Sequence, residues 1–323
     1  MSNKSHITSV GGQALIEGVM MRGPKGVATA IRKPDNSICV ENHDVKYLKD
    51  KCKFFGVPII RGIVAFFESM VLGYKMLMHS AEVSGMEDLD DVEMNKFEKW
   101  VSDKLGDKFM DFIMGFASVL GFILAFVIFF YLPVFFFSKL NAWCDFRLTP
   151  WQGTIEGITK IVIFVIYMIL VSQMNDVKRL FKYHGAEHKS IACYEKGEEL
   201  TVENVKKCTR FHPRCGTSFM FAMLILSIFV VTLFSLIVPT ELKQNTVVWM
   251  CIKLPLIPII MGIGYEFIKY AGRHNNLFVK IISAPGLWMQ RITTKEPDDD
   301  IIEVGIESLK AVITDNIEDD EIK

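Results

Sequence analysis

Four long apolar segments dominate the pattern of hydrophobic and polar positions along the chain. Two of them, Phe112 to Phe137 and Gly216 to Thr240, contain no charged residue. At about 1.5 Å of rise per residue, each would as a helix cross a hydrocarbon core roughly 30 Å thick. Two further segments, Ile155 to Met174 and Asn245 to Tyr265, each carry a lysine close enough to a helix end to reach the interface. The pattern therefore predicts four membrane-spanning helices.

The segments outside these spans predict a small part of mixed α/β structure. Val27 to Arg32 and Ile38 to Asn42 flank the turn former Pro34 to Ser37, which indicates a β-hairpin. Phe54 to Met78 is apolar but carries charges, so an interfacial helix suits it better than a fifth span. Pro297 begins a predicted C-terminal helix with one apolar side. The expected fold is mainly α, a multi-pass helical membrane protein.

These elements divide the chain into five consecutive regions. They are an N-terminal cytoplasmic region with the hairpin and the interfacial helix (1–110), the first two spans (111–174), a cytoplasmic loop (175–215), the last two spans (216–268), and a C-terminal cytoplasmic segment with its helix (269–323). The loop 175–215 is rich in Lys and Arg, whereas the connections 139–154 and 240–246 hold few. The positive-inside rule therefore predicts that this loop and both termini are cytoplasmic. No apolar segment follows Met1 closely enough to indicate a cleavable signal.

Composition narrows the classes of molecule that the protein could bind. The 36 Lys and Arg residues balance 37 Asp and Glu residues, which gives a net charge of −1 and no support for nucleic-acid binding. The lipid bilayer is the expected partner. Most of the 7 cysteines fall on the predicted cytoplasmic side, where thiols stay reduced and are free to bind metal. Disulfides are not expected.

Histidine and cysteine are concentrated in one segment, from His184 to Cys215. It holds six of these residues, where uniform scatter of the 7 His and 7 Cys would put about 1.4 in 32 positions. The densest part has the form H-x-x-E-H, so on a helix His184, Glu187 and His188 would share one face. In the inverted zincin motif, which has this spacing, the two histidines bind zinc and the glutamate is the general base. The cluster therefore predicts a metal site.

Residues elsewhere could complete this site. His212 and Cys215 offer an H-x-x-C pair of ligands suited to zinc. Glu266, at the end of the fourth predicted span, could add a carboxylate, or could pair with Lys269 or Arg273. The alternatives are a closed structural zinc knuckle and solvated histidines without a metal.

The glycine-rich segment Gly11 to Pro24 is a second constellation. It fits neither the phosphate-binding loop G-x-x-x-x-G-K-[ST] nor the dinucleotide pattern G-x-G-x-x-G. Its spacing is that of a turn-rich strand in which Glu17 and Arg22 could form a surface ion pair. If the site is catalytic, Arg22 or Arg214 could stabilise an anionic transition state.

The chain resembles one known family in several long motifs. They are Gly12 to Pro24, Tyr183 to Lys189, His212 to Ser218, Ala284 to Arg291 and Glu296 to Asp299, which together extend over nearly the whole length. In these motifs it resembles the YqhQ family, bacterial membrane proteins catalogued as a domain of unknown function (DUF 1385) and as predicted metal-dependent enzymes. The resemblance implies a metal and an integral membrane location but supplies no substrate. It also makes a simple surface pair in the N-terminal motif less attractive.

Three functional hypotheses follow. The first is a metal-dependent enzyme of the inner membrane surface, a hydrolase, with ligands from His184, His188, His212 and Cys215 and with Glu187 as general base. The second is a non-enzymatic membrane scaffold or assembly factor with a structural metal site. A transporter ranks last, since the spans carry no central Asp, Glu, His or Arg to mark a pathway. The substrate, the identity of the metal and the oligomeric state, monomer or homo-oligomer, stay open.

Overall fold

The computed structural model describes residues 7–48, 53–85, 107–271, 274 and 276–321. The chain forms two compact units. The first unit comprises Met1–Gly85, Met168–Met223 and Met261–Lys323, and the second unit comprises Met86–Tyr167 and Leu224–Ile260. Residues 86–106, which the sequence assigned to the N-terminal region, lie outside the described residues.

A four-stranded antiparallel sheet is the centre of the first unit. Its strands are β1 (Gly11–Leu15), β2 (Gly18–Gly23), β3 (Gly26–Arg32) and β4 (Ile38–His43), paired in sequence order. The predicted hairpin is confirmed as β3 and β4, and its turn is closed by the Ser37 amide, which donates to Asp35 Oδ1 at 2.9 Å. The glycine-rich segment supplies the two strands that precede it, which the hairpin needs because two strands alone are rarely stable.

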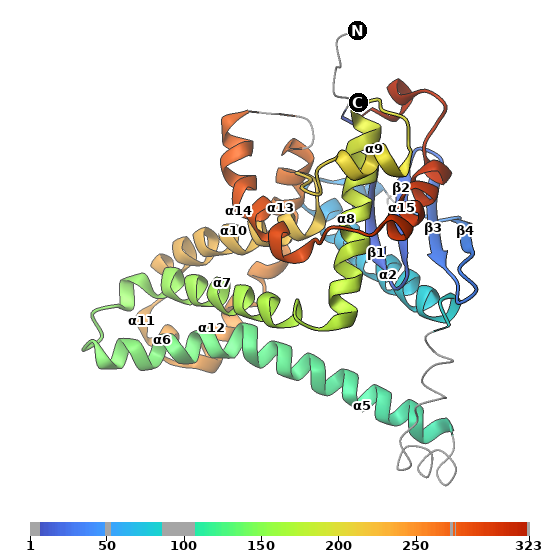
Figure 1. Ribbon diagram of the computed structural model, residues 1–323. Helices are drawn as coiled ribbons and strands as arrows, with labels where there is room; N and C mark the ends of the chain where they lie inside the picture. The colour runs from blue at the N-terminus through green and yellow to red at the C-terminus, as the bar shows by residue number, and fades with distance from the viewer. Residues whose placement is uncertain (1–6, 49–52, 86–106, 272–273, 275, 322–323) are drawn as a thin grey trace. The chain divides into compact units, whose positions relative to one another are not determined.

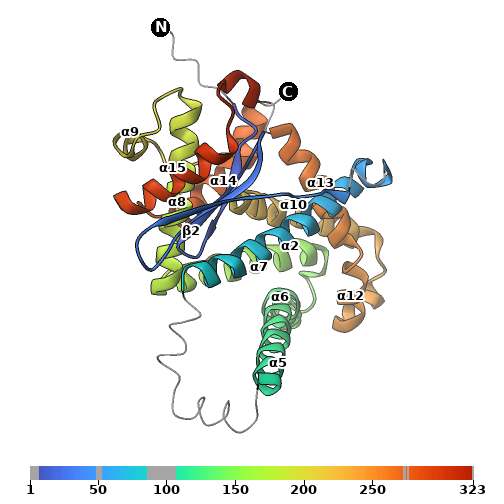
Figure 2. The same ribbon diagram turned by 90° about the vertical axis from the view of Figure 1, so that its right-hand side faces the viewer.

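Helices cover both faces of this sheet, as Figures 1 and 2 show. Helices α8 (Asn175–Glu195) and α15 (Asp299–Val312) pack on one face, and α2 (Ile60–Val83) packs on the other. Successive side chains of a strand point to opposite faces, so Val19 enters the core with α8 and α15 while Met20 packs toward α2. The sheet is thereby buried between two apolar layers.

The first unit contains several further elements besides the sheet and these three helices. They are η1 (Lys53–Gly56), α9 (Val202–Lys207), the first turns of α10 (Gly216–Ile237), the last turns of α13 (Leu256–Ala271), α14 (Leu277–Thr293) and η4 (Ile317–Asp320). The segment predicted as an interfacial helix, Phe54 to Met78, is mostly α2. This helix packs on the sheet through Leu72 and Met76 and leaves Phe67 and Tyr74 exposed.

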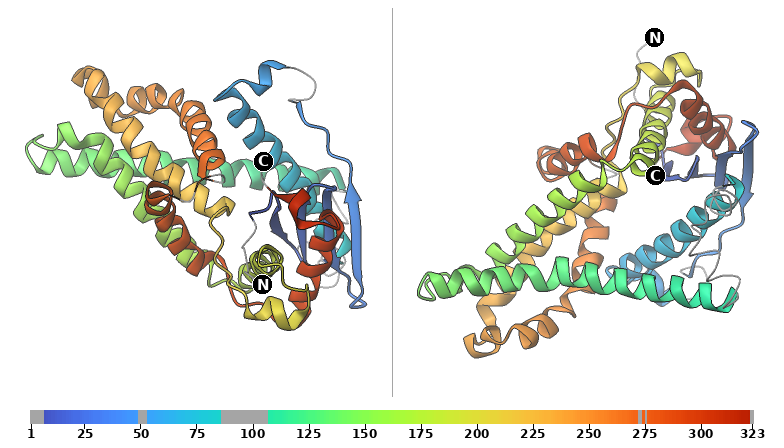
Figure 3. Two further views of the ribbon diagram at one scale, coloured as in Figure 1. Left: turned by 90° about the horizontal axis from the view of Figure 1, so that it is seen from above. Right: turned by 60° about the horizontal axis from the view of Figure 1, so that its bottom comes forward.

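The second unit is helical. It contains α5 (Asp107–Phe126), η2 (Val127–Tyr131), α6 (Leu132–Trp143), η3 (Thr149–Trp151), most of α7 (Gln152–Val171) and of α10, α11 (Thr240–Gln244) and α12 (Thr246–Lys253). Helices α5 and α6 continue one another through the π-helical η2, as Figure 3 shows. Phe129 of η2 contacts Phe164 and Tyr167 of α7, with ring centroids 6.4 and 5.7 Å apart. Gly153 allows α7 and α10 to pack closely, because a Cβ at this position would lie 2.7 Å from Thr232 Cα.

Four helical segments in the described chain are long and apolar enough to cross a membrane. They are Gly115–Trp143, Thr149–Val171, Gly216–Ile237 and Thr246–Ala271. The number and approximate positions match the sequence prediction. Their apolar side chains are largely exposed, as at Phe122 (75%). Lipid contact would remove the cost of exposing such surfaces to water.

The structure also places a buried acid in α7 that the sequence prediction overlooked. Glu156 is buried in the second unit, where it accepts hydrogen bonds from Trp249 Nε1 at 2.9 Å and Gln152 Nε2 at 2.9 Å. Lys253 Nζ lies 2.6 Å from its Oε2. Lys253, expected to extend to the interface, therefore forms an ion pair within the unit instead. An acid with these partners is satisfied structurally and does not by itself indicate a transport pathway.

Candidate metal centre

Helix α8 carries the H-x-x-E-H motif and fixes it in the core of the first unit. Asp176 in its first turn complements the positive end of the helix dipole. The helix ends before Gly197, whose positive φ of 67° suits a residue after a helix C-terminus. His184, Glu187 and His188 lie on one face as predicted, and His188 and Glu187 are almost fully buried.

Three predicted ligands converge in the structure. One donor atom from each of His184, His188 and Cys215 lies within 4.8 Å of the other two, and all three residues are buried. His184 Nε2 is 3.2 Å from Cys215 Sγ. Imidazole nitrogen and thiolate sulfur are the ligand types that zinc prefers. The donor set therefore fits such an ion in kind.

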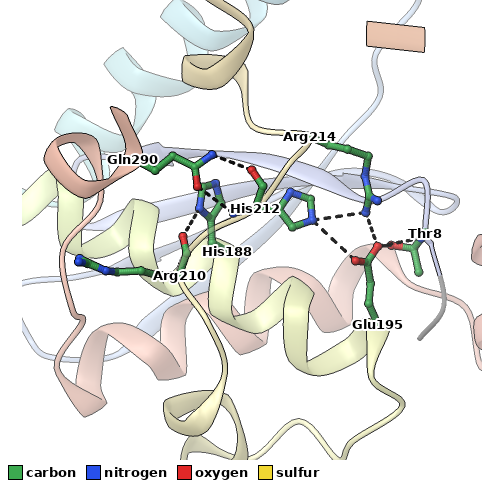
Figure 4. Close-up of polar contacts among 7 residues, drawn as sticks. All are labelled: Thr8, His188, Glu195, Arg210, His212, Arg214 and Gln290. Atoms are coloured by element: carbon green, nitrogen blue, oxygen red, sulfur yellow. Dashed lines mark hydrogen bonds and ion pairs between the residues drawn. The ribbon is translucent and has the colours of Figure 1, made fainter. Parts of the chain in front are cut away.

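The outer nitrogens of both histidines are held by backbone carbonyls. His184 Nδ1 donates to Thr293 O at 2.8 Å, and His188 Nδ1 donates to Arg210 O at 2.6 Å, the second of which Figure 4 shows. A carbonyl only accepts hydrogen bonds, so Nδ1 of each ring carries a proton and Nε2 is the nitrogen left to bind a metal. Metal-binding histidines in proteins are oriented in this way.

Electrostatics favour a thiolate at this position. Burial raises the pKa of Cys215, but the charges and hydrogen bonds of His184 and His188 outweigh it and hold that pKa well below its usual value. Burial lowers the pKa of His184, but the thiolate raises it, and the result is about 9. The thiolate is the form of cysteine that binds metals and acts as a nucleophile.

Glu187 lies beside this group with one carboxylate oxygen unsatisfied. The side chain is 5% exposed, and its Oε2 has no hydrogen-bond partner among the described residues. Burial raises the pKa of Glu187, while the two neighbouring histidines and the amide of Gly12 lower it. A buried carboxylate oxygen without a partner is costly unless a proton or a cation satisfies it. This oxygen is a second observation that fits a bound ion.

The N-terminal motif reaches the candidate centre through Gly12. A Cβ at this position would lie 2.5 Å from Met20 O and 3.1 Å from Glu187 Cδ. Only glycine allows β1 to approach α8 this closely. The expected pair of Glu17 with Arg22 is not formed. Glu17 pairs with Arg179 instead, and the Arg22 guanidinium lies 4.6 Å from the centre of the Tyr47 ring, outside the His/Cys group.

His212 lies next to the three ligands but its ring has other partners. Its Nε2 is 3.7 Å from Glu195 Oε2 and 3.4 Å from Arg214 (Figure 4). Its backbone is fixed by Gln290, whose Oε1 accepts from the His212 amide at 2.8 Å and whose Nε2 donates to the carbonyl at 2.6 Å. Burial lowers the pKa of His212. The structure therefore does not bring His212 into the group of three.

Arg214 and Glu266 are also placed away from the group's centre. Arg214 forms an ion pair with Glu195, which also accepts from the Thr8 amide at 2.8 Å (Figure 4). Glu266 pairs with Arg61 of α2, whose Nε lies 2.6 Å from Oε1. The sequence had suggested Lys269, Arg273 or a metal as the partner. The structure gives Glu266 this long-range partner, and Arg273 lies outside the described residues.

A second set of possible ligands comprises Cys193, Glu198 and Cys208. Both cysteines belong to a buried apolar cluster with Val205. Burial and the neighbouring Cys208 raise the pKa of Cys193 to about 12. The thiol of Cys193 is therefore protonated at neutral pH, which makes it a poor ligand and agrees with its interpretation as a packing residue.

Sequence reasoning missed Gln290, Thr293 and Glu195. Gln290 falls in the motif Ala284 to Arg291, which the sequence indicated only as part of the family resemblance. Its amide also donates to Ser218 Oγ at 2.6 Å, so it joins the His212 loop to the start of α10. No signal in the helix singled out Gln290, since Lys280 and Arg291 of α14 are polar as well. Thr293 acts through its backbone carbonyl. Because every residue has such a carbonyl, the sequence gives no signal for this contact.

Gly185, between the two histidines, provides a test of this packing. A Cβ there would lie 2.0 Å from Lys295 O, a backbone atom that cannot turn aside. Gly185→Ala is therefore expected to lower the free energy of unfolding by about 1–3 kcal/mol, as overpacking does. Gly11→Ala is the matched control, because nothing lies within 4 Å of its Cβ position. Equal thermal melting temperatures for the two variants would contradict the close contact.

Comparisons with known proteins confirm the family resemblance that the motifs indicated. Residues 57–315 match the family described as "Protein of unknown function (DUF1385)". The chain is 34% identical over 316 residues to the "Uncharacterized protein YqhQ" of Bacillus subtilis (strain 168), which covers 97% of this chain and 95% of that protein. No solved structure matches the chain. The chain therefore belongs to the DUF1385 family of proteins of unknown function.

Proposed function

We propose that this protein is a metal-dependent hydrolase of the inner membrane surface, with a divalent ion, best zinc, held by His184, His188 and Cys215. The observation that carries the proposal is that donor atoms of His184, His188 and Cys215 lie within 4.8 Å of one another, while backbone carbonyls hold Nδ1 of both histidines. Three protein ligands leave a coordination position open, as in catalytic zinc sites. An ion bound there would act as a Lewis acid and acidify water.

Glu187 is the proposed general base. Its unpartnered Oε2 is available to take a proton from water beside the ligands, and the Gly12 amide holds the carboxylate in place. The pKa of Glu187, raised by burial, brings its proton affinity closer to that of a base working near neutral pH. Arg214, adjacent to Cys215, is the proposed cation for a developing negative charge. Arg22 is not needed, since it stacks on Tyr47.

The proposed location follows from the membrane-like helices and the charge pattern. Four apolar helices support insertion in a membrane. The basic loop 175–215, which carries α8 and Cys215, favours the cytoplasmic side for the site and for both termini. Thiols are reduced there, as a cysteine ligand requires.

A second candidate function is acyl transfer by Cys215 without a metal. The 3.2 Å contact from Cys215 Sγ to His184 Nε2, with His184 Nδ1 fixed by Thr293 O, has the order of nucleophile, base and orienting group. In this case Sγ would form a bond to the carbonyl carbon of the substrate, the bond from that carbon to its leaving group would break, and His184 would give the thiol proton to the leaving group. The contacts are the same for both functions, so a measurement of bound metal decides between them.

The test is metal analysis of the purified protein by mass spectrometry. The metal site predicts about one zinc ion per chain and a large loss of zinc in Cys215→Ala and His188→Ala, because each removes a direct ligand. Cys251→Ala, which replaces an exposed cysteine of α12, is the control and should keep its zinc. Alkylation of Cys215 should become fast only after chelation. Wild-type protein that holds no zinc after purification or reconstitution, and whose Cys215 is alkylated rapidly, would exclude the metal and favour the second candidate.

A further inference from the structure

A cavity of about 310 Å³ lies in the first unit, against Cys215. Its walls come from the loop before α10 and from faces of three helices, with Phe219 and Ala222 on α10, Phe267 on α13 and Leu287 on α14. The volume is at the small end of the range of about 300–1,000 Å³ found for ligand pockets. It is large enough for a headgroup and the first part of an attached chain.

Most of the lining is apolar. Helices α10 and α13 each belong to a segment long and apolar enough to span a membrane, and they contribute aromatic and aliphatic side chains to this cavity. An occupant that fills the cavity must therefore bury hydrocarbon surface, and burial of apolar surface stabilises binding. A small polar molecule alone would leave these side chains in contact with water.

The charged residues of the lining favour an anion. Arg214 and Lys280 line the cavity together with His274 and a single acid, Glu195. Glu195 is paired with Arg214. Among the described residues no carboxylate is paired with Lys280, so its positive charge is left for an occupant. The cavity thus combines an apolar wall with an excess of positive charge.

Cys215 is shared between this cavity and the His184/His188/Cys215 group. An occupant of the cavity would therefore reach the proposed reaction centre. We infer that the cavity binds an anionic amphiphile, a hydrocarbon chain carrying a phosphate headgroup, as the substrate of the reaction. The role of the amphiphile as a substrate rests on the proposed function, whereas its binding can be measured independently of that function.

The binding test uses purified protein in detergent and three probes. They are palmitoyl lysophosphatidic acid, palmitoyl lysophosphatidylcholine and inorganic phosphate. The expected result is that the anionic lipid binds at least about 10-fold more tightly than the zwitterionic lipid, and that phosphate alone binds weakly, since only the first probe matches both charge and apolar wall. Equal affinity for both lipids would overturn the anionic selectivity. Binding of phosphate as tight as that of the lipid would assign the site to a free anion.

Variants locate the binding in this cavity. Lys280→Glu is expected to weaken binding of the anionic lipid about 10-fold, and Lys178→Glu, on an exposed lysine of α8 outside the cavity, should not. Ala222→Trp should block the cavity, whereas Leu236→Trp, at an exposed position of the same helix, should not. Unchanged lipid binding in both Lys280→Glu and Ala222→Trp would overturn the inference.

Zinc is measured in the same preparations, because this separates the two proposals. Zinc retained in a protein that does not bind the lipid sinks the cavity inference and leaves the proposed metal site. Selective lipid binding by a protein without zinc sinks the metal site and leaves the cavity as a lipid site. Loss of zinc in Ala222→Trp would show that this variant disturbs Cys215. In that case lipid binding by Lys280→Glu, at an exposed lysine, decides whether the lipid occupies the cavity.

Discussion

Replacing Glu187 with glutamine is expected to reduce activity about 10²–10⁴-fold while zinc stays bound. The substitution keeps the shape of the side chain and removes its ability to accept a proton. It also removes a buried carboxylate whose Oε2 has no partner among the described residues, so the melting temperature should stay the same or rise. Activity is measured as complementation of a strain that lacks the gene, and zinc and melting temperature are measured on purified protein.

The scaffold alternative makes the opposite set of predictions. If the free oxygen of Glu187 closes the coordination as a fourth ligand, the site is structural and Glu187→Gln should lose zinc and stability together. Glu203→Gln, at an exposed acid in the first turn of α9, is the matched control and should resemble wild type. Full complementation by Glu187→Gln with zinc still bound would contradict the enzyme and leave a scaffold whose structural metal site does not use Glu187 as a ligand. The two hypotheses thus differ in whether function and metal content change together.

Local spacing predicted the part of the site that a single helix determines. His184, Glu187 and His188 share a face because positions i, i+3 and i+4 of any α-helix do, and the apolar segments predicted the four helices in the same way. The approach of Cys215 to His184 was also anticipated, since only a short segment separates the two motifs. These features depend on residues that are near one another in the chain.

Partners that come from distant segments could not be predicted in this way. Glu266 was assigned to a metal or to nearby bases, but it pairs with Arg61, which is about 200 positions earlier in the chain. His212 was grouped with the ligands, and only the tertiary packing shows that Glu195, Arg214 and Gln290 hold its ring and backbone. The side chain of a residue in a loop can point in several directions, and spacing alone does not choose among them.

A large pH effect on stability is expected from Glu195. Although burial raises its pKa, the hydrogen bond to His212, the charge of Arg214 and the amide of Thr8 lower it to about 2, from 4.5 in the unfolded chain. A carboxyl whose pKa is lower in the folded state stabilises the fold above the unfolded pKa. That stability is lost as the pH falls from about 5 to about 2. The side chain is 14% exposed, and the shift corresponds to about 3 kcal/mol at neutral pH.

Glu195→Gln should therefore be about 3 kcal/mol less stable than wild type at pH 7, and this difference should close as the pH is lowered toward 2. Thermal unfolding of both proteins in detergent, measured from pH 7 to pH 3, tests the expectation. Taking the difference between the two proteins cancels contributions they share, including acid release of any zinc from the histidines. Glu199→Gln, at an exposed acid of the same segment, is the control and should follow wild type at every pH. A stability difference between Glu195→Gln and wild type that stays constant down to pH 3 would contradict this prediction. It would mean that Glu195 has the same pKa in the folded and unfolded protein, so that the ion pair with Arg214 does not lower it.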